Sequence, residues 1–240
     1  MRYTTRGIVI HSVRYGDTAA IVSVLTEDHG LQSYMVRGVY KTRSRFPAAL
    51  FSQLNLLELE ADDQCYGSLQ HPKEIRIEEP YLQMHTDVRK SSVCLFLSEV
   101  LHQSIRHTEE NRDMFRFVRD SLRWYDTADS FPLLFHHWFL LQMTSFLGFF
   151  PAEPETGQTC FNLPEGRFQS SEFPRNDLIE PGPSALMAVL LKVTPSQLSE
   201  LRVPKEIHTA LLGKILDYYR YHLDHFREIR SHQVLMSVFS

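Results

Sequence analysis

The residues of this chain whose types and spacing could do chemistry are basic and aromatic, and they gather in one stretch. From His29 to Leu57 the sequence has no acidic residue. Within it, cations and rings are interleaved: Arg37, Lys41, Arg43, Arg45, Tyr34, Tyr40 and Phe46. Single-stranded nucleic acids are bound by such combinations, because the cations follow the phosphates and the rings stack on unpaired bases. The stretch therefore indicates nucleic-acid binding, and the alternative is a solvated hairpin tip whose rings belong to the core.

A second basic feature is a row of four arginines separated by four, three and four residues: Arg112, Arg116, Arg119 and Arg123. This spacing places all four on one face of a helix. Like charges at such steps repel by about 0.2–0.5 kcal/mol per pair, and a nearby anion would relieve that repulsion. We expect the row to contact DNA or an acidic peptide of a partner. The alternative is a solvated helix face, softened by the acidic residues between the arginines.

Signatures of covalent catalysis and of metal binding are missing from the sequence. It has no phosphate-binding glycine loop, no dinucleotide fingerprint, no nucleophile elbow and no metalloprotease motif. The three cysteines, Cys65, Cys94 and Cys160, are far apart and form no C-x-x-C pair. The 12 histidines form no H-E-x-x-H motif, and helix-surface or core histidines are the favoured interpretation. We therefore expect a protein that is not an enzyme and that needs no metal or other cofactor.

The composition limits the class of protein further. With 240 residues and 43% hydrophobic content, the chain can form one large domain or two small ones. Its formal net charge of -4 argues against a protein that coats duplex DNA non-specifically, although it allows a local basic groove. No signal-peptide core and no run of 18 apolar residues are present, and the cysteine usage fits a reducing compartment. We expect a cytoplasmic protein without a membrane segment.

Short strands must position the basic stretch. Turn residues separate four runs that are β-branched or alternate in polarity: Arg6–Val13, Ala19–Thr26, Leu31–Val39 and Phe51–Leu59. A fifth strand is expected in Gln64–Gln70 or Glu74–Ile77. Short strands about ten residues apart are typical of small barrels and sandwiches. The sequence therefore predicts a five-stranded β-barrel of the oligonucleotide-binding (OB) type in residues 1–80.

After Pro80 the hydrophobic period changes to that of helices. Helices are predicted over six ranges: Tyr81–His107, Glu109–Tyr125, Pro132–Leu147, Ser184–Leu191, Pro195–Leu201 and Pro204–Phe226. Residues 148–183 interrupt them with many prolines and glycines, and a hairpin is expected at Cys160–Gln169. The prediction is an α+β protein with a helical domain in 81–240 and an irregular insert at about 148–183.

The order of these features resembles the bacterial recombination mediator family RecO. The resemblance rests on Gly7–Ile10, Tyr15–Asp17, Ile21–Thr26 with Gly30-Leu31, Val36–Gly38 with Lys41 and Ser44, Leu54–Glu58, Tyr218–Leu223 and Ile229–Leu235. These motifs lie at the two ends of the chain, and the middle helices are only loosely similar. None is as specific as a phosphate-binding loop, so the order and spacing of the set carry the resemblance.

The resemblance implies a fold, an activity and partners. Members have an N-terminal OB barrel and a C-terminal helical domain, bind single-stranded and in some cases double-stranded DNA, and anneal complementary strands. With RecR they load recombinase onto strands coated by single-strand-binding protein, whose acidic C-terminal tail they contact. By position, Arg37, Lys41, Arg43 and Arg45 take the DNA-binding role, and a peptide-binding adaptor is the alternative. Some relatives hold zinc through four cysteines in the insert, whereas this chain has only Cys160 there.

Overall fold

The computed structural model describes residues 2–62, 69–106, 109–170 and 175–239. The chain divides into two compact units, Met1–Thr127 with Ile229–Ser240, and Ala128–Glu228. The boundary predicted between residues 80 and 81 marks the change from strands to helices, whereas the first compact unit contains helices as well. Each unit is described separately.

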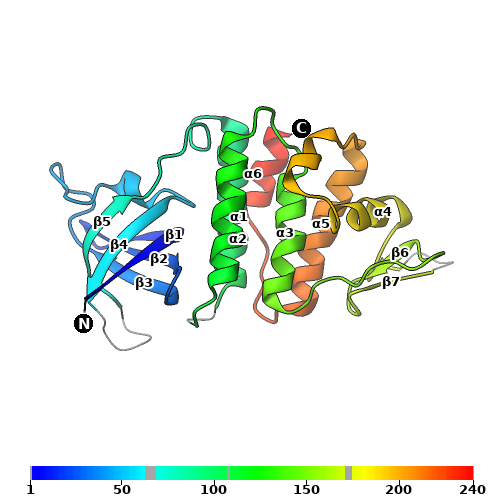
Figure 1. Cartoon of the computed structure of the whole chain (residues 1–240), viewed down its shortest axis with the longest axis horizontal. Helices are drawn as coiled ribbons and strands as arrows, with labels where there is room; N and C mark the ends of the chain where they lie inside the picture. Colours follow the sequence, from blue (N-terminus) through cyan, green and yellow to red (C-terminus); the bar gives the residue numbers. More distant parts are fainter. Residues whose placement is uncertain (1, 63–68, 107–108, 171–174, 240) are drawn as a thin grey trace. The chain divides into compact units, whose positions relative to one another are not determined.

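Five strands of the first unit form one antiparallel sheet in the order β3-β2-β1-β4-β5, as Figure 1 shows. Their bounds are β1 Arg2–Tyr15, β2 Ala19–Thr26, β3 Gly30–Val36, β4 Leu56–Asp62 and β5 Pro72–Ile77. The turn between β1 and β2 uses Gly16 at φ 62°, a conformation that favours glycine. The predicted first three strands are confirmed within a few residues at their ends. Of the predicted fifth-strand segments, Gln64–Ser68 lie outside the described residues, and Glu74–Ile77 lies within β5.

The predicted fourth strand, Phe51–Leu59, begins five residues later than expected. Residues Ala48–Phe51 form a 3-10 helix instead. Leu54 then takes a left-handed φ of 62°, which ordinary strand backbone does not allow. The side-chain amide of Asn55 donates to the carbonyls of Ala49 (3.0 Å) and Leu50 (3.1 Å) and so holds this turn. Local side-chain bonding to the backbone therefore delays β4 to Leu56.

The sheet does not close into the predicted barrel, although the OB-type strand order is present. Among the described residues, one parallel bridge, between Tyr34 of β3 and Gln70 just before β5, links the two edges of the sheet. There the amide of Gln70 donates to the carbonyl of Ser33, and Met35 donates to Gln70, both at 2.8 Å. The next donor in a parallel ladder is the residue two positions after Gln70, which is Pro72. Proline has no N–H, so the ladder ends at this point.

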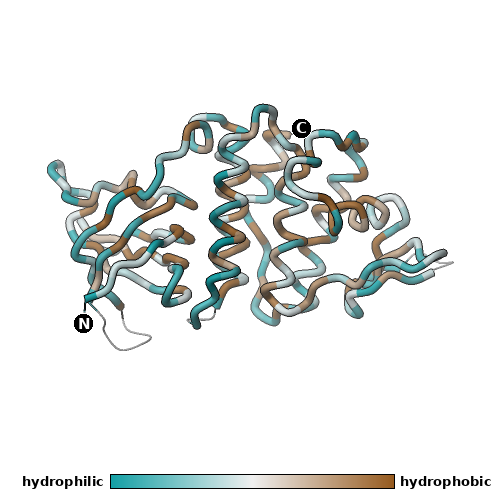
Figure 2. The backbone as a smooth tube through the Cα atoms, in the orientation of Figure 1, coloured by the Kyte–Doolittle hydropathy of each residue, from teal (hydrophilic) through white to brown (hydrophobic). Residues whose placement is uncertain are grey.

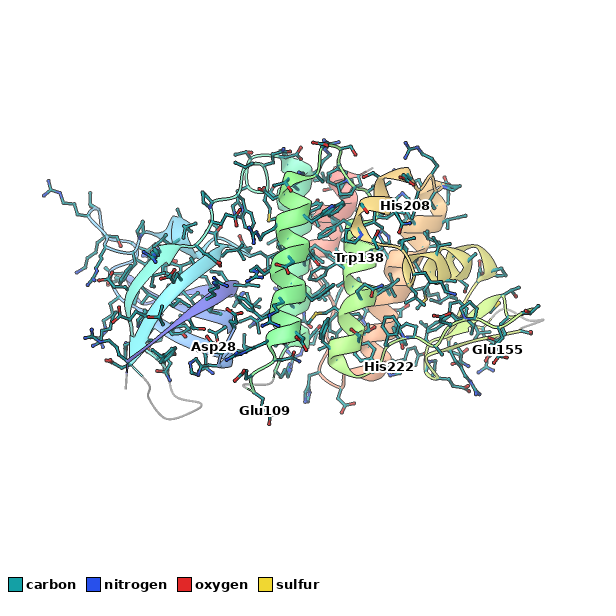
Figure 3. All side chains as sticks on the ribbon, in the orientation of Figure 1. Asp28, Glu109, Trp138, Glu155, His208 and His222 are labelled. Atoms are coloured by element: carbon teal, nitrogen blue, oxygen red, sulfur yellow. The ribbon has the colours of Figure 1, made fainter. Side chains whose placement is uncertain are left out.

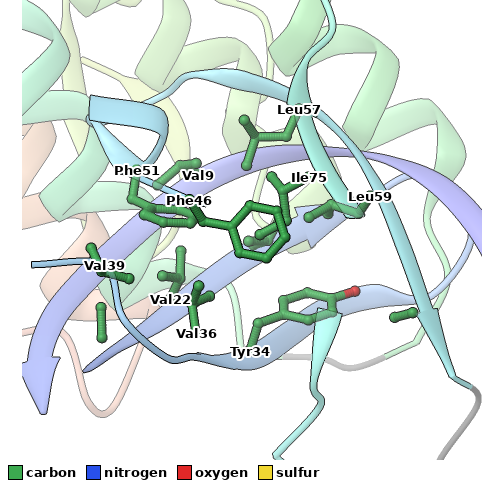
Figure 4. Close-up of a cluster of buried hydrophobic side chains, with 13 residues drawn as sticks. Val9, Val22, Tyr34, Val36, Val39, Phe46, Phe51, Leu57, Leu59 and Ile75 are labelled. Carbon is green, nitrogen blue, oxygen red and sulfur yellow. The ribbon is translucent and has the colours of Figure 1, made fainter. Parts of the chain in front are cut away.

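The core of the sheet is built from alternating inward-facing side chains. Figure 4 shows this cluster, which includes Val9, Val22, Tyr34, Leu59 and Ile75. Each of these side chains is at most 7% exposed. Phe46, from the segment after β3, completes the cluster at 8% exposure. The loop that carries the basic residues is thus attached to the core by its own aromatic side chain.

Three helices complete the first unit: α1 Val88–Ser104, α2 Arg112–Thr127 and α6 Ser231–Val238. The carboxylate of Asp87 caps α1 by accepting the amides of Arg89 (2.8 Å) and Lys90 (3.2 Å), so the helix starts seven residues later than predicted. On β1, the carbonyl of Ile10 accepts a hydrogen bond from Ser98 Oγ at 2.6 Å. Helix α6, which the sequence did not predict, packs against α1.

A carboxylate joins α1 to α6, and a pair of stacked histidines joins α1 to β1. Glu99 of α1 accepts the amides of Arg230 (3.0 Å) and Ser231 (2.8 Å), which fixes the start of α6. The rings of His11 on β1 and His102 on α1 stack at 4.2 Å between centroids, with 22° between their planes. Burial lowers the pKa of both histidines. The pair is therefore a neutral contact near pH 7.

A buried carboxylate holds the segment that leads into α1. Asp126, only 3% exposed, accepts the backbone amides of Leu82 (2.8 Å), Gln83 (2.9 Å) and Met84 (2.7 Å). The ammonium of Lys90, 2% exposed, donates to the Asp126 carbonyl at 2.8 Å. Burial lowers the pKa of Lys90, and the negative charges of nearby acidic residues partly offset this effect. The network satisfies buried polar groups that would otherwise be costly.

The second unit contains α3 Phe135–Leu147, α4 Pro181–Leu190, a 3-10 helix Pro195–Glu200 and α5 Lys205–His222. A small sheet, β7-β6-β8, lies in the predicted irregular insert and includes the expected hairpin; its strands are β6 Cys160–Asn162, β7 Arg167–Gln169 and β8 Leu178–Ile179. Tyr218 donates to the Phe149 carbonyl at 2.6 Å, and His222, labelled in Figure 3, bonds the Leu163 carbonyl at 2.9 Å. Side chains of α5 therefore order the insert.

Candidate nucleic-acid interface

The basic loop leaves the sheet directly after β3. Gly38 has a φ of 75°, and its carbonyl accepts the amide of Lys41 at 3.2 Å, so the chain reverses there. A left-handed turn of this kind favours glycine. The side chains of Arg37, Lys41, Arg43 and Arg45 are all exposed. The structure thus presents to solvent all four cations that the sequence singled out.

Three of these cations have no carboxylate partner in the part of the chain that the structure describes. Among the described residues, Arg37, Lys41 and Arg43 form no ion pair and no side-chain hydrogen bond. In contrast, Arg2, Lys73 and Arg76 of the same sheet pair with Glu60 (3.2 Å), Asp62 (2.9 Å) and Glu58 (2.6 Å), respectively. Unpaired cations keep their full field for an external anion. The loop is therefore suited to bind phosphates.

Arg45 differs from the other three loop cations. Its guanidinium pairs with Glu74 of β5 and lies 5.1 Å from the ring centroid of Phe46. Both contacts hold the side chain near the open edge of the sheet. That Arg45 contacts DNA stays a prediction, in which a phosphate would have to compete with Glu74 for the guanidinium.

Tyr34 lies in the core, which corrects the prediction that its ring contacts DNA. The residue is 1% exposed, and its hydroxyl lies 3.2 Å from that of Tyr3. Burial and this hydrogen bond raise the pKa of Tyr34. Figure 4 shows its ring inside the apolar cluster, where no base can stack on it. Residues 32, 34 and 36 face the core, which the sequence does not reveal because both faces of this strand carry polar and apolar residues.

Tyr40 is exposed and brings in a cation that the sequence analysis missed. Its side chain is 41% exposed, and the guanidinium of Arg14 lies 5.0 Å from the ring centroid. Arg14 also donates to the carbonyls of Gly16 (3.2 Å) and Asp17 (2.9 Å), so its position is fixed. A cation over a ring leaves the opposite ring face free for stacking. Arg14 lies at the end of β1, next to the turn at Gly16, and is distant from Tyr40 in the sequence. The two side chains meet only when the chain folds.

The arginine row on α2 is paired within the chain. Arg112 bonds Asp28 (2.9 Å), labelled in Figure 3, and Arg123 bonds Glu79 (2.9 Å). Arg116 pairs with Asp113 at 3.6 Å, and Arg119 pairs with Asp120 at 2.9 Å. Figure 2 shows hydrophilic and hydrophobic residues alternating along this helix. The repulsion within the row is therefore relieved by the protein's own carboxylates, and no external anion is needed for this.

Arg119 is the least accessible member of the row, with 15% of its side chain exposed. Burial opposes its charge, but the bond to Asp120 and the charges of Glu78 and Glu27 outweigh this effect and raise its pKa. Its guanidinium also lies 5.9 Å from the ring centroid of Phe115. The contacts of Arg119 are therefore with residues of its own helix, Asp120 and Phe115.

The described residues contain neither a cluster of metal ligands nor a helix suited to a membrane. No group of three or more His, Cys, Asp or Glu side chains is arranged to hold a metal ion there. Cys94 and Cys160 are buried free thiols, and burial raises the pKa of Cys94; Cys65 lies outside the described residues. Within the described ranges, no helix is both long and apolar enough to cross a membrane.

The five-stranded sheet, with the exposed basic loop after β3, defines a protein of the OB type. Family models agree with this class: one described as "Recombination protein O N terminal" matches residues 1–81, and one described as "Recombination protein O C terminal" matches residues 85–231.

Similar proteins extend over the whole chain. The DNA repair protein RecO of Flavobacterium psychrophilum is 34% identical over 241 residues, and that of Flavobacterium johnsoniae is 35% identical over 243 residues. The RecO protein of Bacteroides fragilis is 31% identical over 242 residues. All three alignments cover 100% of both chains. The chain belongs to the RecO family of DNA repair proteins.

Proposed function

We propose that this protein binds single-stranded DNA through the loop after β3, anneals complementary strands and helps to load recombinase onto strands coated by single-strand-binding protein. The observation that carries the proposal is the contrast in ion pairing. Arg37, Lys41 and Arg43 are exposed and unpaired among the described residues, whereas the sheet cations Arg2, Lys73 and Arg76 are paired with carboxylates. This contrast supports the proposal, because the unpaired loop cations would attract phosphates even though the chain as a whole is net-negative.

The proposed action is electrostatic and requires no covalent step. Two phosphate backbones repel each other, and cations placed between them lower the cost of bringing complementary strands together. The loop supplies three such charges, and the exposed ring of Tyr40 supplies a surface on which an unpaired base can stack. RecR and the acidic tail of single-strand-binding protein are proposed partners on the strength of family membership, and the proposed setting is the cytoplasm.

The proposal is tested by measuring strand annealing with two complementary labelled oligonucleotides. We expect the protein to accelerate annealing of both bare strands and strands coated by single-strand-binding protein. Substituting Lys41, Arg43 and Arg45 by alanine should slow annealing and weaken binding to the single strand. Annealing at the uncatalysed rate by the folded, unaltered protein would refute the annealing role. A triple variant that binds DNA as well as the parent would show that the site is assigned wrongly.

A further inference from the structure

The open edge of the sheet forms a pocket whose lining includes one of the loop cations, Arg37. Its volume is about 350 Å3, within the range of small-ligand sites. It is lined by the end of β3, the loop and the start of β5: Met35, Val36, Arg37, Phe46, His71 and Pro72. The pocket lies immediately beyond the bridge between Tyr34 and Gln70. It exists because Pro72 cannot extend that ladder, so the two strands separate.

The lining combines flat or apolar side chains with one unpaired cation. Phe46 and His71 supply rings, Met35 and Pro72 supply apolar contacts, and Arg37 is exposed without a partner among the described residues. A nucleotide needs this combination, since its base is flat and its phosphate is negative. Lys41 and Arg43, a few residues further along the loop, would meet neighbouring phosphates of the same strand.

We propose that this pocket receives one unpaired nucleobase of a bound single strand, with Arg37 on the adjoining phosphate and His71 against the base. The proposal rests on the proposed DNA binding and adds a place where bases, rather than the backbone alone, contact the protein. An acidic peptide with an apolar end would also suit an apolar pocket beside a cation. The loop cations Arg37, Lys41 and Arg43, unpaired among the described residues, favour a nucleic acid over such a peptide, because the phosphates of a nucleic acid repeat at regular intervals.

The test separates base contacts from phosphate contacts by using two probes of equal length. One is an oligothymidylate, and the other is an abasic oligonucleotide with the same number of phosphates. His71 is exposed, so His71→Ala should fold normally. We expect this variant to bind oligothymidylate about fivefold or more weakly, as for loss of one stacked base, and to bind the abasic strand as the parent does. Arg37→Ala should weaken binding of both strands.

Lys73→Ala provides the matched control, because Lys73 lies two residues further along on β5, is exposed and is paired with Asp62. It should not distinguish the two probes. If the parent binds neither strand, the proposed function fails and the pocket assignment fails with it. If the parent binds DNA but His71→Ala changes both affinities equally, or neither, only the pocket assignment fails. If His71→Ala lost affinity for an acidic peptide and kept its affinity for oligothymidylate, the pocket would belong to a protein partner and the nucleobase proposal would be overturned.

Discussion

The loop cations Arg37, Lys41 and Arg43 should control how DNA affinity depends on salt. Binding of a cation to a phosphate of a single strand releases counterions, and each contact contributes about -0.7 to the slope of log affinity against log salt. Replacing all three residues by alanine should therefore make the slope less steep by about 2 units. Between about 50 mM and about 200 mM salt, the parent should lose roughly 20-fold more affinity than the variant.

The structure offers a control with the same change in net charge. Arg2, Lys73 and Arg76 are also exposed cations of the sheet unit, but each is paired with a carboxylate, at 3.2, 2.9 and 2.6 Å. Their triple alanine variant removes three positive charges and should leave the slope nearly unchanged. Fluorescence anisotropy of a labelled single strand, titrated at several salt concentrations, measures both slopes. Equal losses of slope in the two triple variants would refute a local site and show that only the total charge matters.

Three further outcomes follow from the fold. Asp126→Ala should lower the free energy of unfolding by about 3–5 kcal/mol in urea titrations, because three backbone amides lose their buried acceptor and the Lys90 ammonium loses a nearby negative charge; a loss below about 1 kcal/mol would contradict the network. Burial lowers the pKa of His11 and His102 below 6.5. The charge of Glu99 opposes this effect at both rings, and Arg106 lowers the pKa of His102 further. As the pH falls, the unfolded chain therefore takes up protons before the folded chain does. The stability that these rings contribute above pH 6.5 should therefore begin to fall as the pH drops below that value and should be lost once the pH is below their lowered pKa in the folded state. His102→Asn should flatten this dependence in urea titrations from about pH 7 to about pH 5, whereas parallel curves for parent and variant would show that the pair does not cause it. Replacing Arg112 and Arg123 by alanine should cost at most about 1 kcal/mol each, since both pairs are exposed, and should leave the salt slope of DNA binding intact; a slope change like that of the loop variant would place DNA on α2.

Local sequence signals predicted most of the elements. The β-branched run Ala19–Thr26 forms β2 with the same bounds, and the hairpin expected in the insert forms as β6 and β7. Helix ends were less predictable, because caps decide them: the carboxylate of Asp87 starts α1, well after the hydrophobic period begins. Helix α6 escaped prediction because it has only eight residues and is fixed by Glu99, which lies far away in the sequence.

The candidate site was predictable in its charges and not in its surroundings. The acid-free stretch identified Arg37, Lys41 and Arg43, which the structure presents to solvent. The sequence alone could not separate the exposed ring of Tyr40 from the buried ring of Tyr34, since both are tyrosines beside cations. Nor could it show that each arginine of the α2 row has a carboxylate partner.

The sequence by itself determined the strand-then-helix order, the basic loop and the absence of known catalytic motifs, because these depend on residue types and short spacings. Only the tertiary structure decided which cations remain unpaired, which rings are accessible and where the sheet stays open. Those properties depend on residues distant in sequence, such as Arg112 with Asp28 or Gln70 with β3, that meet only when the chain folds. The pocket beside Arg37 depends on such a contact. Pro72 begins β5 and has no N–H, so it ends the hydrogen-bond ladder to β3, which lies more than thirty residues earlier in the sequence.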